Sequence, residues 1–190
     1  NGTLTGHNTD GVGYMRAVKD AGFHIIGKKM TLLGAGGAAT AILVQAALDG
    51  MAQISVFLRK TSRFYERAQE TAEILRKRTG AQIRLCDFSD QELLKRELSD
   101  SAILTNATSV GMAPNDQSCP IPDSSFLPSG LIVSDIIYNP RETLLLRMAK
   151  EIGLPAFNGS YMLLYQGAEA FRLWTGKEMP AQQIKQAFFT

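Results

Sequence analysis

The sequence predicts an α/β protein built around a parallel β-sheet, and two observations lead to this fold class. Short apolar runs rich in β-branched residues alternate along the chain with longer segments of helical period. This alternation is typical of strand–helix–strand units, in which helices bury both faces of a parallel sheet. A glycine-rich loop also lies directly between the apolar run 29–33 and the helical segment after it. We therefore expect one doubly wound domain over residues 1–190.

The elements follow in order from these patterns. Each of the six predicted strands is a short apolar run bounded by turn-forming residues, at 29–33, 53–58, 82–86, 102–106, 131–136 and 155–157. Four helices lie between them, each ending at or near a Gly, Asp or Ser, at 38–48, 64–79, 91–98 and 141–152. Two more helices, 11–21 and 161–175, flank the alternating units. Residues 113–129, rich in Pro, Ser and Asp, are expected to form a long loop.

The composition excludes several classes of partner. The formal net charge is +2 with no long basic run, so we expect no nucleic-acid or membrane partner. Cys86 and Cys119 lie far apart, and neither they nor His7 and His24 show metal-ligand spacing. We therefore predict no disulfide, no metal site and a reduced, cytoplasmic setting. The chain begins at Asn1 without Met or a signal segment, which indicates a piece of a longer protein.

The glycine-rich loop matches the dinucleotide-binding fingerprint G-x-G-x-x-G/A, with Ala39 in the last position. In this fingerprint the first glycine makes a tight turn and the second lets the backbone approach a pyrophosphate. The helix that follows would direct its unpaired N–H groups at the phosphates. A turn used only for packing, or a site for another cofactor such as a methyl donor, is the alternative. The loop thus predicts a Rossmann-type domain that binds a dinucleotide through Gly34, Ala35, Gly36, Gly37 and Ala38.

The end of the second predicted strand favours NADP over NAD. An acidic residue is expected there in NAD-binding domains, where it accepts from the ribose 2′-hydroxyl. This sequence has no carboxylate at that position and instead carries cations and hydroxyl groups that suit a 2′-phosphate. The candidates are Arg59, Lys60, Thr61 and Arg63, next to Ser62. The alternative is a solvated loop whose charges face water.

Four further segments lie near predicted strand ends or loops, where an open α/β sheet places its ligands. They read Asn-Thr-Asp-Gly at 8–11, Asn-Ala-Thr-Ser-Val-Gly-Met at 106–112, Asp-Ile-Ile-Tyr-Asn-Pro at 135–140 and Gly-Ser-Tyr-Met-Leu-Leu-Tyr-Gln-Gly-Ala at 159–168. In order and spacing with the glycine loop, this set resembles the shikimate dehydrogenase family, including its quinate/shikimate branch. The resemblance covers essentially the whole chain.

The resemblance implies that Asp10 is the family's catalytic aspartate and contacts the substrate. In the family, this aspartate works with a lysine from an N-terminal domain that also holds most of the substrate, and this sequence contains neither. A hydride that reaches a carbonyl carbon leaves charge on the oxygen, and a positioned acid must neutralise that charge. From the residues alone, the alternative is that Thr9 or Asp10 caps the helix that follows.

The resemblance also implies the remaining site residues. Tyr138 and Gln166 correspond to residues that contact the substrate, whereas without the family they would be a half-buried core tyrosine and a polar residue on a helix. Gly159 corresponds to a glycine whose carbonyl meets the cofactor on its nicotinamide side. The other expected cofactor contacts are Asn106, Thr108, Ser109, Val110, Ile136 and Met162, for which turn or core roles are the alternative.

The function implied is the NADP-dependent interconversion of 3-dehydroshikimate and shikimate in aromatic amino-acid biosynthesis. The alternative is a quinate/shikimate dehydrogenase that uses NAD. This chain would be the cofactor-binding half, inactive alone. A methylenetetrahydrofolate-type reductase would share the glycine loop but has no reason to carry Asn-Thr-Asp-Gly. A non-catalytic NADP-binding regulatory module would need no catalytic Asp10. The oligomeric state stays open, with a homodimer as one alternative.

Overall fold

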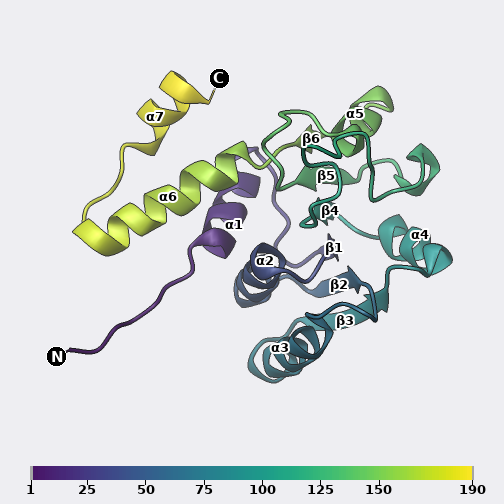
Figure 1. Cartoon of the computed structure of the whole chain (residues 1–190), viewed down its shortest axis with the longest axis horizontal. Helices are drawn as coiled ribbons and strands as arrows, with labels where there is room; N and C mark the ends of the chain where they lie inside the picture. Colours follow the sequence, from purple (N-terminus) through teal and green to yellow (C-terminus); the bar gives the residue numbers. More distant parts are fainter. Residues whose placement is uncertain (1, 190) are drawn as a thin grey trace.

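The computed structural model describes residues 2–189, so Asn1 and Thr190, the ends of the predicted domain, lie outside it. A single sheet of six parallel strands has the order β3-β2-β1-β4-β5-β6 (Figure 1). This is the Rossmann order, so the predicted fold class is confirmed. The strands are β1 (Lys29–Leu33), β2 (Gln53–Leu58), β3 (Gln82–Asp87), β4 (Ile103–Asn106), β5 (Ile132–Asp135) and β6 (Ala156–Phe157).

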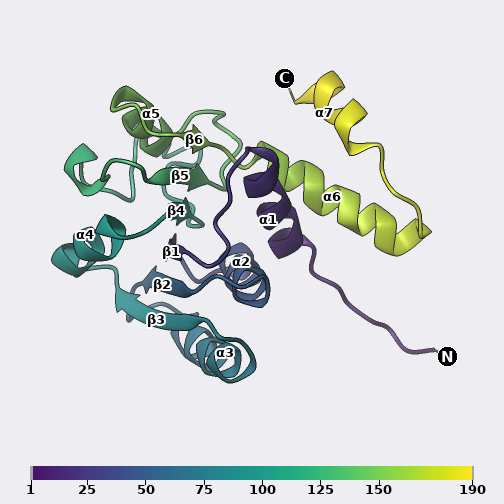
Figure 2. The same ribbon diagram turned by 180° about the vertical axis from the view of Figure 1, so that it is seen from behind.

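Helices cover both faces of the sheet (Figures 1 and 2). One face carries α1 (Asp10–Asp20), α2 (Gly37–Leu48), α3 (Tyr65–Arg78) and α6 (Ser160–Thr175). The other carries α4 (Gln91–Ser99), the 3-10 helix η1 (Ser124–Phe126) and α5 (Leu144–Glu151). The short helix α7 (Ala181–Phe188) lies beyond α6 near the end of the chain. The sheet is therefore the middle layer of three.

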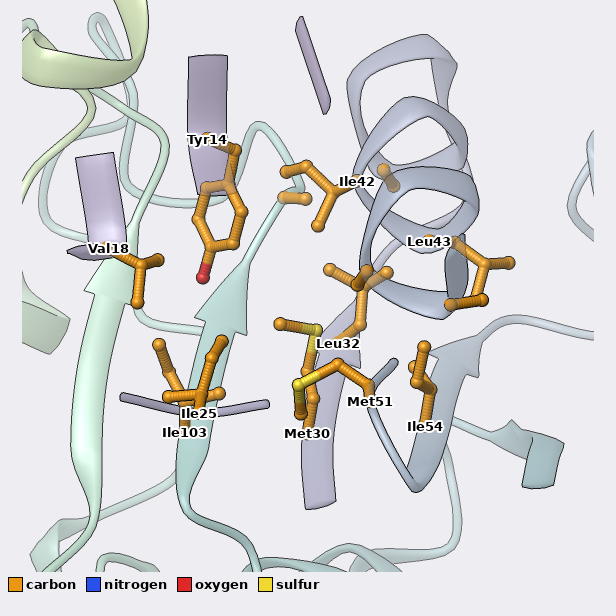
Figure 3. Close-up of a cluster of buried hydrophobic side chains, with 14 of the residues drawn as sticks. Tyr14, Val18, Ile25, Met30, Leu32, Ile42, Leu43, Met51, Ile54 and Ile103 are labelled. Carbon is orange, nitrogen blue, oxygen red and sulfur yellow. The ribbon is translucent and has the colours of Figure 1, made fainter. Parts of the chain in front are cut away.

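The alternation of side chains along the strands separates two apolar cores. In β1, Met30 and Leu32 face the core beneath α1 and α2, whereas Leu33 faces the core beneath α4 and α5. Ile103 and Leu104 divide in the same way in β4. Side chains of a strand point to opposite faces in turn, so central strands must be apolar on both sides. Figure 3 shows part of the first core, between α1, α2 and the strands.

Tyr14 is the one large polar side chain among those labelled in Figure 3, and it points its hydroxyl at the sheet. The ring is 1% exposed, and the hydroxyl forms hydrogen bonds with Thr105 Oγ1 and Ser134 Oγ. These bonds replace the water that the hydroxyl loses on burial. Tyr14 thereby fixes α1 over β4 and β5.

The structure differs from the expected elements mainly after the fourth strand. The helix expected at 141–152 begins at Leu144, because the Thr143 hydroxyl accepts from Leu146 N and forms its N-cap. The expected loop 113–129 contains η1, which is capped by Asp123. The helix α7 was not predicted. It is only eight residues long and buries only Ala181, and an ion pair between Lys185 and Asp20 ties it to α1. Within residues 2–189, none of the helices has the length and apolar character that a bilayer crossing requires.

Candidate functional site

Two clefts share a wall at the carboxyl edge of the sheet, where β1 and β4 are neighbours and the loops after them diverge. The glycine-loop cleft, about 430 Å³, is lined by 34–36, 57–59, Ser62, Phe64, Phe88 and 107–110. The Tyr138 cleft, about 440 Å³, is lined by 108–109, 112–113 and 136–139. Thr108 and Ser109 line both clefts. This edge, where the strand order reverses, is where open α/β sheets bind their ligands.

Gly34 makes the tight turn out of β1. Its φ is +106°, a conformation that side chains disfavour, and its N–H donates to Phe57 O at 2.8 Å. A Cβ at this position would lie 2.7 Å from Ala107 O. The residue must therefore be glycine for reasons internal to the chain, and it brings the loop after β1 against the loop after β4.

Gly36 is different, because nothing in the chain requires a glycine there. It is the N-cap of α2 with φ −70° and ψ −172°, and a Cβ would meet no atom within 4 Å. Gly37 is equally open. No side chain caps α2 and no acidic residue lies in its first turn, so its first N–H groups and positive dipole end face this space. Gly36 and Gly37 leave open space beside the backbone although no neighbouring atom of the chain requires it. This space fits a ligand whose phosphates approach the backbone.

The predicted phosphate-binding residues after β2 are only partly brought together. Arg59 lines the glycine-loop cleft, but Lys60, Thr61 and Arg63 do not. Lys60 Nζ lies 3.5 Å from the Asp87 carboxylate, and the Arg63 guanidinium lies 4.8 Å from the centre of the Phe64 ring. Asp87 comes from β3, directly beside Leu58 in the sheet. Hydrogen bonds from Ser89, together with Lys60, hold the pKa of Asp87 below its usual value. A carboxylate therefore does lie near this strand end.

Asn106 is fully buried beneath the 107–110 turn and does not line either cleft. Its Oδ1 accepts from Thr108 N and Thr108 Oγ1, at 3.1 and 2.7 Å, and its Nδ2 donates to Val110 O at 3.1 Å. Nδ2 also donates to the buried Asp135 carboxylate. Burial raises the pKa of Asp135, although hydrogen bonds from Ile137 N, Asn106 and Thr143 oppose the rise. Thr108, Ser109 and Val110 lie in the clefts above this network.

Gly159 and Met162 lie behind the Tyr138 cleft. A Cβ at Gly159 would lie 1.9 Å from Ile136 O, so only glycine lets the β6–α6 loop approach the loop after β5. Ile136 lines the cleft, while Met162 is 8% exposed and packs in the core. Tyr138 is 51% exposed at the cleft wall. The tyrosine is therefore free to meet a ligand and is not a core residue.

Asp10 and Gln166 lie on the two helices that flank this edge, α1 and α6. Gly13, one turn after Asp10, packs so closely on α6 that a Cβ there would lie 2.6 Å from Gln166 N. Both side chains are partly exposed, and neither lines the two clefts. The capping alternative for Asp10 is wrong, because no side chain caps α1; Asp10 N instead donates to Asn8 Oδ1 at 2.9 Å. The carboxylate is thus not used as a cap.

A larger cavity, about 790 Å³, lies at the opposite edge of the sheet, where β1, β2 and β3 begin. Most of the polar side chains that line it are paired with one another or with the backbone. Glu97 contacts Lys29 Nζ and Arg84 Nη1, each at 2.8 Å, and Arg76 donates twice to Ile83 O. The cavity lies away from the glycine loop, so we do not assign the cofactor to it. Among the described residues, no group of His, Cys, Asp and Glu could hold a metal ion.

Sequence reasoning missed several residues of the clefts. The glycine-loop cleft also contains Ser62, Phe64 and Phe88, and the Tyr138 cleft also contains Met112, Ala113, Ile137 and Asn139. Most are apolar and carry no chemical signature. Phe88 had one usable signal, because it directly follows a strand that pairs with β2, and carboxyl ends of parallel strands meet at one edge.

The strand order, the glycine loop and the open N-terminus of α2 together define a Rossmann-type NAD(P)-binding domain. Residues 159–187 match the family model described as Shikimate 5′-dehydrogenase C-terminal domain. The NADP(+) shikimate dehydrogenases of Listeria monocytogenes and Streptococcus pneumoniae are 52% and 51% identical over 188 and 187 residues, which are 99% and 98% of this chain and 64% of each relative. Nearly the whole chain is therefore similar to NADP(+) shikimate dehydrogenases.

A solved structure shows the same similarity. The crystal structure of shikimate 5-dehydrogenase from Listeria monocytogenes, in complex with shikimate and NAD, matches with a TM-score of 0.94 and 52% identity. The match covers 100% of this chain and 65% of that one. The chain thus spans about 64% of the length of the curated relatives it matches.

Proposed function

We propose that this chain is the cofactor-binding part of an NADP-dependent shikimate dehydrogenase, which interconverts 3-dehydroshikimate and shikimate. The observation that carries the proposal is the pair of clefts that meet at Thr108 and Ser109 beside the open glycine loop. Two clefts that share a wall suit a ligand with two halves joined by phosphates. The relatives named NADP(+) shikimate dehydrogenase supply the substrate class.

The chain's own residues divide the work of binding. The N–H groups at the start of α2 would hold the pyrophosphate over Gly36, and Arg59 would pair with a 2′-phosphate beside Phe64 and Phe88. Thr108, Ser109 and Ile136 would border the nicotinamide half. When bound, the nicotinamide would exchange a hydride with the substrate carbon. The apolar side chains of Met112, Ala113 and Ile137 line the same cleft and would limit the water around it.

Asp10 would hold the proton that the substrate oxygen gains or loses. Charge that develops on that oxygen needs an acid or base within hydrogen-bond reach. Asp10 is suited to this role because its carboxylate is partly exposed, lies at the start of α1 and is not used as a cap. Gln166 and Tyr138 would orient the substrate hydroxyl groups from α6 and from the cleft wall.

A companion domain would complete the site and supply the lysine that works with Asp10. The chain covers 64% of its relatives, which supports a further domain in the intact enzyme. This chain alone should therefore show negligible turnover, because positioning of the reactants contributes many powers of ten. We also propose a cytoplasmic enzyme. A homodimer stays a prediction, for which the 84% exposure of Trp174 offers a candidate contact.

The test of Asp10 uses the intact protein. In Asp10→Asn, kcat should fall by about 100-fold or more while the Kd for NADP stays unchanged, because the amide keeps the shape but cannot exchange the proton. Asp49→Asn, on the exposed C-cap of α2, is the matched control and should keep full turnover. Unchanged turnover in Asp10→Asn would exclude the catalytic role. Undetectable turnover by the wild type, with NADP still bound, would favour a regulatory module.

NAD is the second candidate cofactor, because Asp87 lies near the end of β2 and holds Lys60. Calorimetric binding measurements on this chain distinguish NADP from NAD as the cofactor. NADP should bind more tightly than NAD, and Arg59→Ala should weaken NADP by about tenfold, the loss of a charge-assisted hydrogen bond, without changing NAD. Arg63→Ala, whose guanidinium lies over Phe64, should change neither. A wild type that prefers NAD would overturn the assignment of NADP.

A further inference from the structure

The Asp135 carboxylate joins the loops that border both clefts. It is 1% exposed at the end of β5. It accepts hydrogen bonds from Ile137 N at 3.0 Å, from Thr143 Oγ1 at 2.8 Å and from Asn106 Nδ2 at 3.1 and 3.2 Å. All of these donors are neutral groups. They come from the loop after β5, the N-cap of α5 and the end of β4.

The carboxylate determines which way the Asn106 amide points. A carboxylate without a proton can only accept, so Asn106 must turn its Nδ2 toward Asp135 and its Oδ1 toward Thr108. That Oδ1 holds both the N–H and the hydroxyl of Thr108, and the Thr108 hydroxyl in turn accepts from Val110 N at 3.1 Å. The position of the 108–110 turn therefore depends on Asp135 through one buried amide.

The dependence differs between the clefts. Both walls of the Tyr138 cleft are tied to Asp135: the 108–109 wall through Asn106, and the 136–139 wall through Ile137 N. In the glycine-loop cleft, the wall made by Arg59, Ser62, Phe64 and Phe88 has no bond to this network. A change at Asp135 should therefore disturb the Tyr138 cleft more than the glycine-loop cleft.

We propose that Asp135 is a positioning residue for the nicotinamide half of the cofactor, acting through the Asn106 amide and the Ile137 N–H. The inference rests on the proposed function, because it assigns the nicotinamide to the Tyr138 cleft. In this proposal Asp135 contacts neither the cofactor nor the substrate. Asp135 instead holds the two walls of the Tyr138 cleft at a fixed separation.

The test is Asp135→Asn in this chain, with two probes: NADP, and adenosine 2′,5′-bisphosphate, which is the adenosine half alone. The new amide would set its Nδ2 against that of Asn106, so Asn106 must lose a partner or flip and release Thr108 N. NADP should bind at least about tenfold more weakly, as expected for a broken buried hydrogen-bond network. Binding of the bisphosphate should change less than about twofold, within the range of a distant site.

Two further variants keep the test decisive. Thr143→Val removes one donor to Asp135, together with the N-cap of α5, at nearly constant volume. It should shift the NADP affinity in the same direction by less, even if Asp135→Asn does not fold. Asp123→Asn is the matched control: its side chain accepts from Ser125, neither residue lines either cleft, and both probes should bind as in the wild type.

The outcomes are distinct. Selective loss of NADP affinity in Asp135→Asn and Thr143→Val supports the positioning role. Equal loss of both probes, or no loss of either, overturns it and leaves the proposed function intact. A wild-type chain that binds neither probe overturns the proposed function, and this inference with it.

Discussion

Gly34 and Gly36 stand two residues apart in one loop but are glycines for different physical reasons. Gly34 has a positive φ and lies against Ala107 O, so its requirement comes from the fold. Gly36 has an ordinary φ and open space where a Cβ would be, so its requirement comes from outside the chain. A substitution of Gly34 should therefore affect stability, and a substitution of Gly36 should affect binding.

Gly34→Ala should destabilise the domain. The backbone conformation alone costs about 1–3 kcal/mol for a residue with a side chain, and the Cβ would also press on the backbone at 107. Urea unfolding measures the loss as a lower midpoint at constant slope. A variant as stable as the wild type would contradict the geometry of this turn.

The buried Tyr14 makes the stability of the protein depend on pH in the alkaline range. Burial raises its pKa from 10.0 to about 12, although the hydrogen bonds from Ser134 and Thr105 act in the other direction. The unfolded chain therefore loses the phenolic proton at a lower pH than the folded chain does. Stability from this residue is present below pH 10 and is lost as the pH rises towards 12.

The expected loss is about 2–3 kcal/mol of unfolding free energy, from two pKa units at 1.36 kcal/mol each. The difference between the wild type and Tyr14→Phe isolates it, because the other tyrosines and the lysines titrate in both proteins. The Phe variant should be less stable at pH 8 and should approach the wild type by pH 12. Parallel stability profiles for the two proteins would refute the buried, neutral Tyr14.

The sequence patterns predicted the backbone conformation at this site better than the pairing of its charged side chains. The glycine fingerprint could be found from sequence because its turn, its open N-cap and its helix are local in the chain. The pairing of Lys60 with Asp87 could not be found, because the two residues meet only when β2 and β3 lie in register. The burial of Asn106 under its own turn was missed for the same reason: its partner Asp135 comes from the next strand of the sheet.

At the scale of elements, Glu97 ties α4 to the three strands below it. Its buried carboxylate contacts Lys29 of β1, Ser55 of β2 and Arg84 of β3. Burial alone would raise the pKa of Glu97, but the hydrogen bonds from Lys29 and Ser55 and the nearby cations lower it below its usual value. The ionised form is therefore the one that holds these elements together.

Glu97→Gln should lower the free energy of unfolding by about 3 kcal/mol at pH 7, because Lys29 is left without its most buried partner. The stability from the carboxylate is present above its unfolded pKa and is lost as the pH falls through the lower folded pKa. The gap between the two proteins should therefore narrow in acid. Glu92→Gln, exposed on the same helix, is the control and should change stability little. A gap independent of pH would show that the charge of Glu97 does not matter.

The elements themselves were largely predictable, because apolar runs and caps are local signals. β1 and β2 have the expected bounds, and α2 and α6 begin one residue earlier than expected. The helix α7 was not predictable in this way, because its cation Lys185 is held by Asp20 and by the ring of Tyr161, from two other helices. Tertiary contacts stabilise a helix that its length alone would not.

At the scale of the whole molecule, the strand order places both clefts, and most of the candidate cofactor residues, at one edge of the sheet. The order follows from alternating strands and helices, and the reversal between β1 and β4 opens the two clefts there. Asp10 and Gln166, which the resemblance implied as substrate contacts, lie on flanking helices outside both clefts. Their substrate would be held between this domain and the proposed companion domain.

The central claim is that the carboxyl edge binds a dinucleotide whose phosphates approach Gly36, and calorimetric titration of NADP into the wild-type chain and Gly36→Ala tests it most directly. The wild type should bind one NADP per chain. Gly36→Ala should keep its unfolding free energy within about 1 kcal/mol, as for a changed helix cap, yet bind at least about tenfold more weakly because its Cβ occupies the space of the phosphates. A wild type that does not bind, or a folded Gly36→Ala that binds equally well, would contradict the account.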